Sequence, residues 1–104
     1  RYNEQLKDIV KHVPQEQADR HHPYHLYSVL VDRRDELKQF LALHDIETLI
    51  HWTCGVHEHD FSTRADIELP NTRNITDNTL SLPCSPFLTR DEQDYIIQKI
   101  KSFY

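Results

Sequence analysis

The sequence predicts a small α+β domain, in which a three-stranded, mostly antiparallel sheet carries helices packed on one face in two layers. Its 104 residues are enough for one domain with a single modest core. A run rich in aromatic and β-branched residues, typical of a strand, lies at 24–31, and short strands are expected at 46–50 and 80–82. Apolar residues at helical spacing occupy the segments around them, which gives the order helix, strand, helix, strand, loop, strand, helix.

Residues 1–13 form the first predicted helix. Apolar residues recur there at helical spacing, and Pro14 ends the run. No capping residue precedes Tyr2, and the chain contains no methionine. We therefore expect residues 1–13 to be the end of a helix that enters from a missing N-terminal domain, and residues 14–104 to be a small domain. The alternative is a short mature protein whose initiator methionine was removed.

Residues 24–31 form the central predicted strand, because they contain neither glycine nor proline. Asp32 is placed to cap the next helix, with Asp35 three residues on in an imperfect capping box. That helix has a mostly apolar face, at the spacing i, i+3, i+4 and i+7, formed by Leu37, Phe40, Leu41 and His44. We expect the core to be built by the strand at 24–31, the helix that follows it and the strand at 46–50.

In the second half of the chain the sequence signals for secondary structure are weaker, except in the last segment. Residues 53–70 are long for a loop inside a compact domain, and such loops are usually functional or mobile. A short surface helix is expected at 71–78, and Pro83 stops the strand at 80–82. Thr89-Arg-Asp-Glu92 is a capping box that opens an amphipathic closing helix, whose apolar face is Ile96, Ile97, Ile100, Phe103 and Tyr104.

Composition excludes several classes of function. The net charge of −5 argues against a nucleic-acid partner held through phosphates. No apolar run approaches the roughly 18–20 residues that cross a bilayer, so no membrane association is expected. The single glycine, Gly55, rules out a glycine-rich phosphate-binding loop. The two cysteines, Cys54 and Cys84, are expected to be free thiols in a reducing, cytoplasmic compartment, with one disulfide left open.

Histidines are abundant, eight in all, and several follow the second predicted strand. A strand end is where α/β proteins tend to place chemistry, and the strand at 46–50 delivers His51 and Trp52. His51 is a candidate for proton transfer or substrate hydrogen bonding, because imidazole titrates near neutrality. Trp52 is either a core residue or an aromatic wall for a ring-shaped ligand. His25, inside the first strand, is interpreted as a satisfied, half-buried histidine.

A metal centre is the other interpretation of this region. Imidazole, thiolate and carboxylate groups all bind zinc, and the loop offers His51, Cys54, His57, Glu58, His59 and Asp60. The loop lacks both H-E-x-x-H and C-x-x-C spacing, and a lone H-x-H in a polar loop is more often solvated. We therefore expect no metal site, with a histidine-based metal-binding domain as a minor alternative.

Several short motifs occur in register along nearly the whole chain. They are Tyr24-His-Leu-Tyr27, Arg34-Asp-Glu-Leu37, Ile46-Glu-Thr-Leu-Ile-His51 followed by an aromatic residue, Leu80-Ser-Leu-Pro83 with Pro86, Leu88-Thr89 and Glu92-Gln93. In this order they resemble the C-terminal small domain of the DegT/DnrJ/StrS family of pyridoxal-phosphate (PLP)-dependent nucleotide-sugar aminotransferases. Arg1-Tyr2-Asn3 with Leu6 resembles the long helix that enters that domain.

The resemblance implies a parent enzyme of PLP fold type I, usually a homodimer, in amino-sugar and surface-polysaccharide biosynthesis. Such a parent moves an amino group from glutamate or another amino acid onto a 3-keto or 4-keto nucleotide sugar. Its cofactor pocket and Schiff-base lysine lie in the large N-terminal domain. No lysine of this chain has the family's lysine context, so the chain alone is expected to be inactive and to bind no PLP.

Site residues carry over only where this sequence matches the family. By resemblance, His51 contacts substrate or assists proton movement, while Trp52 and His57 line the sugar end of the cleft. The sequence departs from the family pattern at four positions, which are Asp45 for glycine, Thr53 and Gly55 for prolines and His59 for glutamine. These departures leave the sugar, the regiochemistry and the activity itself open, because some relatives use the cofactor for dehydration. A stand-alone, non-catalytic interaction module of the same fold is the main alternative.

Overall fold

A computed structural model describes residues 1–59, 63 and 66–104 of the chain. In sequence order its elements are α1 (Tyr2–Leu6), β1 (Tyr27–Leu30), α2 (Arg34–Leu43), the 3-10 turn η1 (Val56–Glu58), α3 (Pro70–Asn78), β2 (Thr79–Leu82) and α4 (Arg90–Phe103). The α+β class expected from the sequence is confirmed. None of the helices in the described ranges is both long and apolar enough to cross a membrane.

The sheet is smaller than expected. In the described part of the chain it has two strands, β1 and β2, which pair antiparallel with Tyr27 opposite Leu82 and Val29 opposite Leu80. Each outer edge carries one isolated antiparallel bridge, His12 with Leu30 and Leu49 with Ser81. The antiparallel arrangement therefore extends by single residues on both sides of a two-stranded ribbon.

The third strand expected at 46–50 is not confirmed, because the backbone of this segment is engaged elsewhere. The amide of Ile46 donates to the carbonyl of Leu41 at 2.9 Å and closes the end of α2. The Lys38 ammonium donates to the carbonyl of Thr48 at 2.5 Å. Leu49 is left to pair with Ser81, through hydrogen bonds of 3.1 and 2.8 Å in the two directions. The segment still follows the edge of β2.

The first helix is also shorter than expected, since α1 ends at Leu6 instead of continuing to residue 13. The backbone of the next residues turns to the sheet: Lys11 and His12 donate to the carbonyl of Leu30, at 2.9 and 3.3 Å, and Leu30 donates back to His12. Leu6 and Val10 are both buried, as their helical spacing required. Hydrogen bonds from Lys11 and His12 to the edge of the sheet thus replace the hydrogen bonds of a continued helix.

The expected cap of α2 by Asp32 is wrong. The N-cap position is Arg33, in a left-handed conformation with φ of 50° and no side-chain cap. The carboxylate of Asp32 pairs instead with Lys11 at 2.8 Å, and its carbonyl accepts from the Tyr104 hydroxyl. The apolar face of α2 is confirmed, with Leu37 and Leu41 fully buried.

The two later helices follow their sequence signals. The surface helix expected at 71–78 is α3. The capping box of α4 is formed, because the Glu92 amide donates to Thr89 Oγ1 at 3.2 Å and the Thr89 amide donates to Glu92 Oε2 at 2.8 Å. Ile96, Ile97 and Ile100 bury the apolar face of α4.

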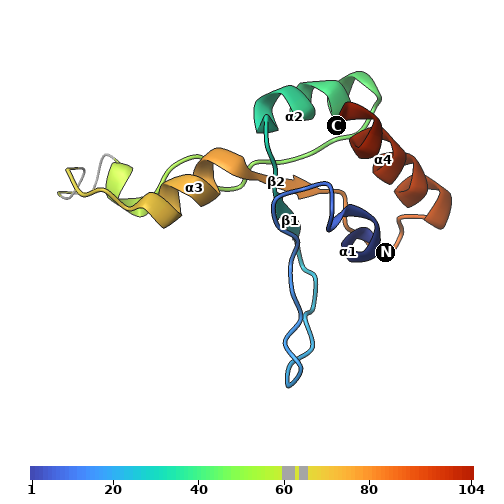
Figure 1. Ribbon diagram of the computed structural model, residues 1–104, viewed down its shortest axis with the longest axis horizontal. Coiled ribbons are helices and arrows are strands. Elements are labelled where there is room, and N and C mark those ends of the chain that lie inside the picture. Colours follow the sequence, from blue (N-terminus) through green and yellow to red (C-terminus); the bar gives the residue numbers. More distant parts are fainter. Residues whose placement is uncertain (60–62, 64–65) are drawn as a thin grey trace.

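One hydrophobic core joins the sheet to α1, α2 and α4. It includes Val29, Leu80, Leu37, Leu41 and Ile100. Figure 1 shows α2 and α4 packed together on one side, while two segments project from this body. One is the loop that connects α1 to β1, and the other is α3 with η1 at its far end. The second projection carries His57, one of the candidates for function from the sequence.

Candidate functional site

A hollow of about 330 Å³, here called the His51 hollow, lies along the outer edge of β2. It is lined by three segments, namely His25 and Leu26, the stretch from Glu47 to Leu49 with His51, and the run from Ser81 to Ser85. The bridge between Leu49 and Ser81 holds the second segment along β2. His51 is exposed at this edge, as the position after a strand-like segment predicts.

His25 enters the same hollow from an unusual turn. Tyr24 has a φ of 49°, in the left-handed region that is unfavourable for a residue with a bulky side chain. Its amide donates to His22 Nδ1 at 2.9 Å, and the two rings stack with centroids 4.2 Å apart. Its carbonyl accepts from the Cys84 thiol at 3.3 Å. Contacts on both sides therefore fix the backbone just before His25.

The interpretation of His25 as a half-buried strand residue is wrong. β1 begins at Tyr27, and His25 is exposed, because the Tyr24 turn ends the extended course of the chain. Hydrophobic periodicity alone gives no sign of this turn. The one sequence signal is that His25 lies within the motif Tyr24-His-Leu-Tyr27 quoted for the family resemblance.

A group of tyrosines supports the turn from behind. The rings of Tyr2 and Tyr27 lie 4.8 Å apart, and those of Tyr24 and Tyr27 lie 6.1 Å apart. The Tyr27 hydroxyl donates to Asn3 Oδ1, and the Tyr2 hydroxyl donates to the carbonyl of Pro83 at 2.9 Å. Burial raises the pKa of Tyr2 and of Tyr27, and the nearby Cys84 contributes to both shifts. Both phenols therefore remain neutral donors at physiological pH.

His57 lies in a second hollow, of about 500 Å³, here called the His57 hollow. η1 contributes His57 and Glu58 to its lining, and residues 66–70 with Arg73 complete it. Within the described residues, His57 Nδ1 is buried and has no hydrogen-bond partner. Gly55 packs against this atom, so it is covered by the chain itself.

Gly55 makes this position of His57 possible. A Cβ atom on Gly55 would lie 2.6 Å from His57 Nδ1 and 2.8 Å from the methyl group of Thr72. The φ of Gly55 is −72°, so close packing, and not backbone conformation, requires glycine here. The Gly55 amide donates to Glu58 Oε2 at 3.0 Å, and Glu58 Oε1 pairs with Arg73 at 3.0 Å. η1 is therefore bound to α3 through one carboxylate.

The three sequence-based candidates do not share one hollow. His51 and His57 lie in different hollows, and the Trp52 side chain, 69% exposed, lines neither of them. The residue that the described structure brings to His51 is His25. The arrangement can form hydrogen bonds to a polar ligand, because both groups at the His51 hollow are imidazoles.

The sequence matches the family described as the DegT/DnrJ/EryC1/StrS aminotransferase family over residues 1–101. The chain belongs to this family. It is 32% identical to the "Pleiotropic regulatory protein" of Geobacillus stearothermophilus, over 97% of this chain and 28% of the relative. It is 29% identical to the "dTDP-3-amino-3,6-dideoxy-alpha-D-galactopyranose transaminase" of Aneurinibacillus thermoaerophilus, over 98% of this chain and 28% of the relative.

Solved structures agree with the family assignment. A DegT/DnrJ/EryC1/StrS aminotransferase from Brucella abortus has a TM-score of 0.88 and 34% sequence identity, over 98% of this chain and 28% of that chain. The chain thus spans little more than a quarter of the length of the aminotransferase-family proteins that it resembles.

The lysines of the described residues lie outside the two hollows. Neither hollow is lined by a lysine, and a PLP enzyme needs one to hold the cofactor. Lys38 is bound to Thr48, Lys11 pairs with Asp32, and Lys99 lies over the ring of Tyr95.

The metal interpretation gains no support from the described residues, in which no group of three or more His, Cys, Asp or Glu side chains could hold an ion. Cys54 Sγ lies 3.6 Å from His59 Nε2, and Asp60 lies outside the described residues. Cys54 and Cys84 are free thiols, as expected.

Proposed function

We propose that the chain is the C-terminal small domain of a PLP-dependent aminotransferase that acts on a keto nucleotide sugar. The observation that carries this proposal is the family match along residues 1–101, combined with coverage of only 28% of the relatives' length. Residues 1–13 would enter from a large N-terminal domain, and residues 14–104 would form the small domain. The parent would serve amino-sugar and surface-polysaccharide biosynthesis.

Three residues of this chain would face the substrate. His51 would contact the sugar or move a proton beside it, which its exposed position in the His51 hollow supports. His57 and Trp52 would line the sugar end of the cleft. The place of His57 in the lining of the His57 hollow, beside Glu58 and Arg73, supports a polar contact there.

The remaining parts of the reaction would come from outside this chain. PLP would be held by a lysine of the large domain, and glutamate or another amino acid would donate the amino group. The parent would be a homodimer in the cytoplasm. This fragment alone would bind no cofactor and would not transfer amino groups.

The role of His51 is tested by His51→Ala in the full-length protein, assayed with glutamate and a keto nucleotide sugar. Turnover should fall about 100-fold or more, with an unchanged melting temperature, because His51 is exposed and its loss leaves the core intact. His21→Ala is the matched control, since the His21 side chain is 86% exposed. If the His51 variant unfolds while activity per folded molecule is unchanged, His51 is structural.

A second candidate is a stand-alone regulatory or interaction module. The one observation in its favour is the name of the Geobacillus relative, a "Pleiotropic regulatory protein". An immunoblot of the source cells against this domain separates the two. A polypeptide several times longer than this chain supports the enzyme, and one of about this length supports the module.

A further inference from the structure

His25 and His51 meet at the His51 hollow although they come from different segments. His25 follows the Tyr24 turn at the entrance to β1, and His51 follows the bridge of Leu49 with Ser81. Within the described chain neither imidazole takes part in a hydrogen bond or an ion pair. Two exposed imidazoles without partners therefore face the same space.

The turn that places His25 has a cost in conformational free energy at Tyr24. A left-handed conformation at a residue with a side chain costs roughly 1–2 kcal/mol. Tyr24 is held there by the His22 ring, by the Cys84 thiol and by Asn3 Nδ2, which donates to the Tyr24 hydroxyl at 3.4 Å. Since backbone strain of this kind persists where surrounding contacts determine it, the turn points to a requirement for the direction of His25.

The chemistry of the His51 hollow suits a neutral, hydroxylated ring. Its lining contains no lysine or arginine, and it contains the carboxylate of Glu47, so an isolated phosphate group is disfavoured. Leu26 and Leu49, which are 42% and 53% exposed, offer apolar surface beside the polar groups. A sugar ring has the same combination of apolar C–H faces and hydroxyl groups.

Only part of the polar lining is available to such a ligand. The Ser81 hydroxyl is shared with Ser28 at 2.7 Å, and the Thr48 carbonyl is taken by Lys38. In the described chain, Glu47 forms no ion pair. His25, His51 and Glu47 are therefore left to bind hydroxyls, beside the Ser85 hydroxyl, which already accepts from the Phe87 amide at 3.1 Å.

We propose that His25 is a specificity-determining residue, which binds a hydroxyl group of the sugar ring together with Glu47 while His51 serves the reacting carbon. This inference rests on the proposed aminotransferase function and deepens it. His25 holds the sugar in both the ground state and the transition state, so its loss weakens binding and leaves the rate of the bound complex nearly unchanged.

The kinetic test uses the full-length enzyme with His25→Ala, and His21→Ala as the matched exposed control. KM for the keto nucleotide sugar should rise about five- to tenfold, with kcat changed less than about threefold. His25→Asn keeps a hydrogen-bonding group and should recover part of the affinity. An unchanged KM, or a loss confined to kcat, would overturn the proposal.

The nucleotide part of the substrate provides a second test, by inhibition. A nucleoside diphosphate without sugar should inhibit the wild type and His25→Ala equally, because His25 is assigned to the sugar. If its inhibition constant rises by the same factor as KM, His25 binds the diphosphate and the assignment to the sugar is wrong.

A binding readout separates failure of this proposal from failure of the proposed function. Cys84 lines the His51 hollow as an exposed free thiol, so its alkylation can be followed by peptide mass spectrometry in the full-length protein. A nucleotide sugar should slow alkylation at least about threefold in the wild type and not in His25→Ala, even if no amino transfer occurs. Absence of protection in the wild type would overturn the proposal, and turnover would still test the enzyme assignment separately.

Discussion

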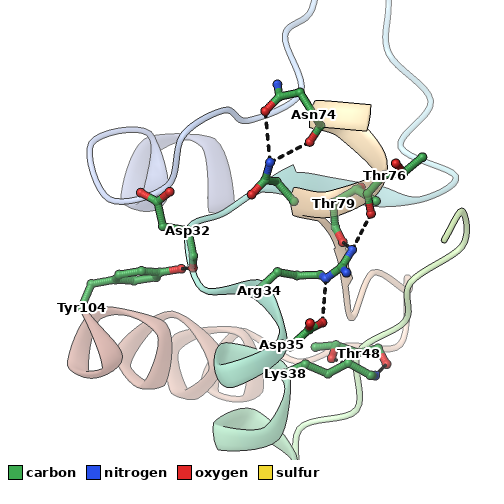
Figure 2. A network of polar contacts seen from close by, with 10 residues as sticks. Asp32, Arg34, Asp35, Lys38, Thr48, Asn74, Thr76, Thr79 and Tyr104 are labelled. Atoms are coloured by element: carbon green, nitrogen blue, oxygen red, sulfur yellow. Dashed lines mark hydrogen bonds and ion pairs between the residues drawn. The ribbon is translucent and has the colours of Figure 1, made fainter. Parts of the chain in front are cut away.

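The guanidinium of Arg34 donates to the backbone carbonyl of Thr76 at 2.6 Å, which joins the first turn of α2 to the last turn of α3 (Figure 2). A second, longer contact of 3.5 Å reaches the carbonyl of Thr79 at the start of β2. Carbonyls at a helix end lack intrahelical partners, so Arg34 satisfies groups that α3 leaves open. α3 in turn holds η1 through Arg73 and Glu58, so Arg34 connects the core to His57.

Loss of this contact should destabilise the fold. Arg34→Met removes a guanidinium that is only 14% exposed and leaves the Thr76 carbonyl without its donor. We expect a loss of about 1.5–3 kcal/mol in the free energy of unfolding, measured by urea denaturation. Asp35→Asn is the control, because the Asp35 side chain is 78% exposed and its pairing with Arg34 should contribute less than about 1 kcal/mol. Equal effects of the two changes would contradict this role of Arg34.

Asp45 should be replaceable by glycine with a gain in stability. It has a φ of 61° just after α2, where its amide donates to Ala42 and the Ile46 amide donates to Leu41, the pattern of a Schellman motif. Asp45→Gly removes the side-chain strain and should raise the free energy of unfolding by about 0.5–1 kcal/mol. Asp45→Ala keeps the strain and should give no gain. A glycine variant less stable than wild type in the same denaturation series would refute the strain.

Gly55→Ala should disturb the His57 hollow. The new methyl group would meet the His57 ring and the Thr72 methyl, so one of them must move. We expect a cost of about 1–3 kcal/mol, typical of overpacking, in the free energy of unfolding. The cost should be smaller when Gly55→Ala is made in a His57→Ala background, because the two nearest ring atoms are then absent. Strictly additive costs in this double-mutant cycle would show that His57 does not limit the space.

Tyr104 should make the fold sensitive to alkaline pH, because its ring is partly covered although the residue is 42% exposed. Burial raises the pKa of Tyr104 to about 12, with Asp32 adding to the shift and Arg33 opposing it, whereas the unfolded tyrosine titrates near 10. Since the folded pKa is the higher one, this stability is fully present below pH 10 and is lost as the pH rises from about 10 to 12.

The measurement is the urea midpoint at a series of pH values from 8 to about 11.5. Tyr104→Phe has no phenol to ionise at this position, so its midpoint should fall less steeply above pH 10 than that of the wild type. Parallel curves for the two proteins would contradict the raised pKa of Tyr104.

Sequence patterns predict the elements whose signals are local. The capping box at Thr89 and the spacing of Ile96, Ile97 and Ile100 locate α4, because cap and apolar face are set by neighbours in sequence. Local patterns do not predict the end of α1 or the structure of the segment at 46–50, because contacts with groups distant in sequence determine both. The edge of β1 captures His12, and Lys38 takes the carbonyl of Thr48.

In the candidate site, too, the sequence predicts what neighbouring residues determine and misses what a distant contact determines. A strand-like segment before His51 predicts its exposed position at the sheet edge, and the structure agrees. The approach of His25 depends on the turn at Tyr24, which Cys84 holds from the far end of β2. No pattern within the sequence encodes that contact, so only the structure brings the two histidines together.

We propose that this chain is the small domain of an enzyme that aminates keto nucleotide sugars. The most direct measurement is mass spectrometry of the product after the full-length protein is incubated with PLP, glutamate and a 3-keto or 4-keto nucleotide sugar. We expect a nucleotide sugar in which an amino group replaces the keto oxygen. Recovery of both keto sugars unchanged, with glutamate and with other amino-acid donors, would contradict it.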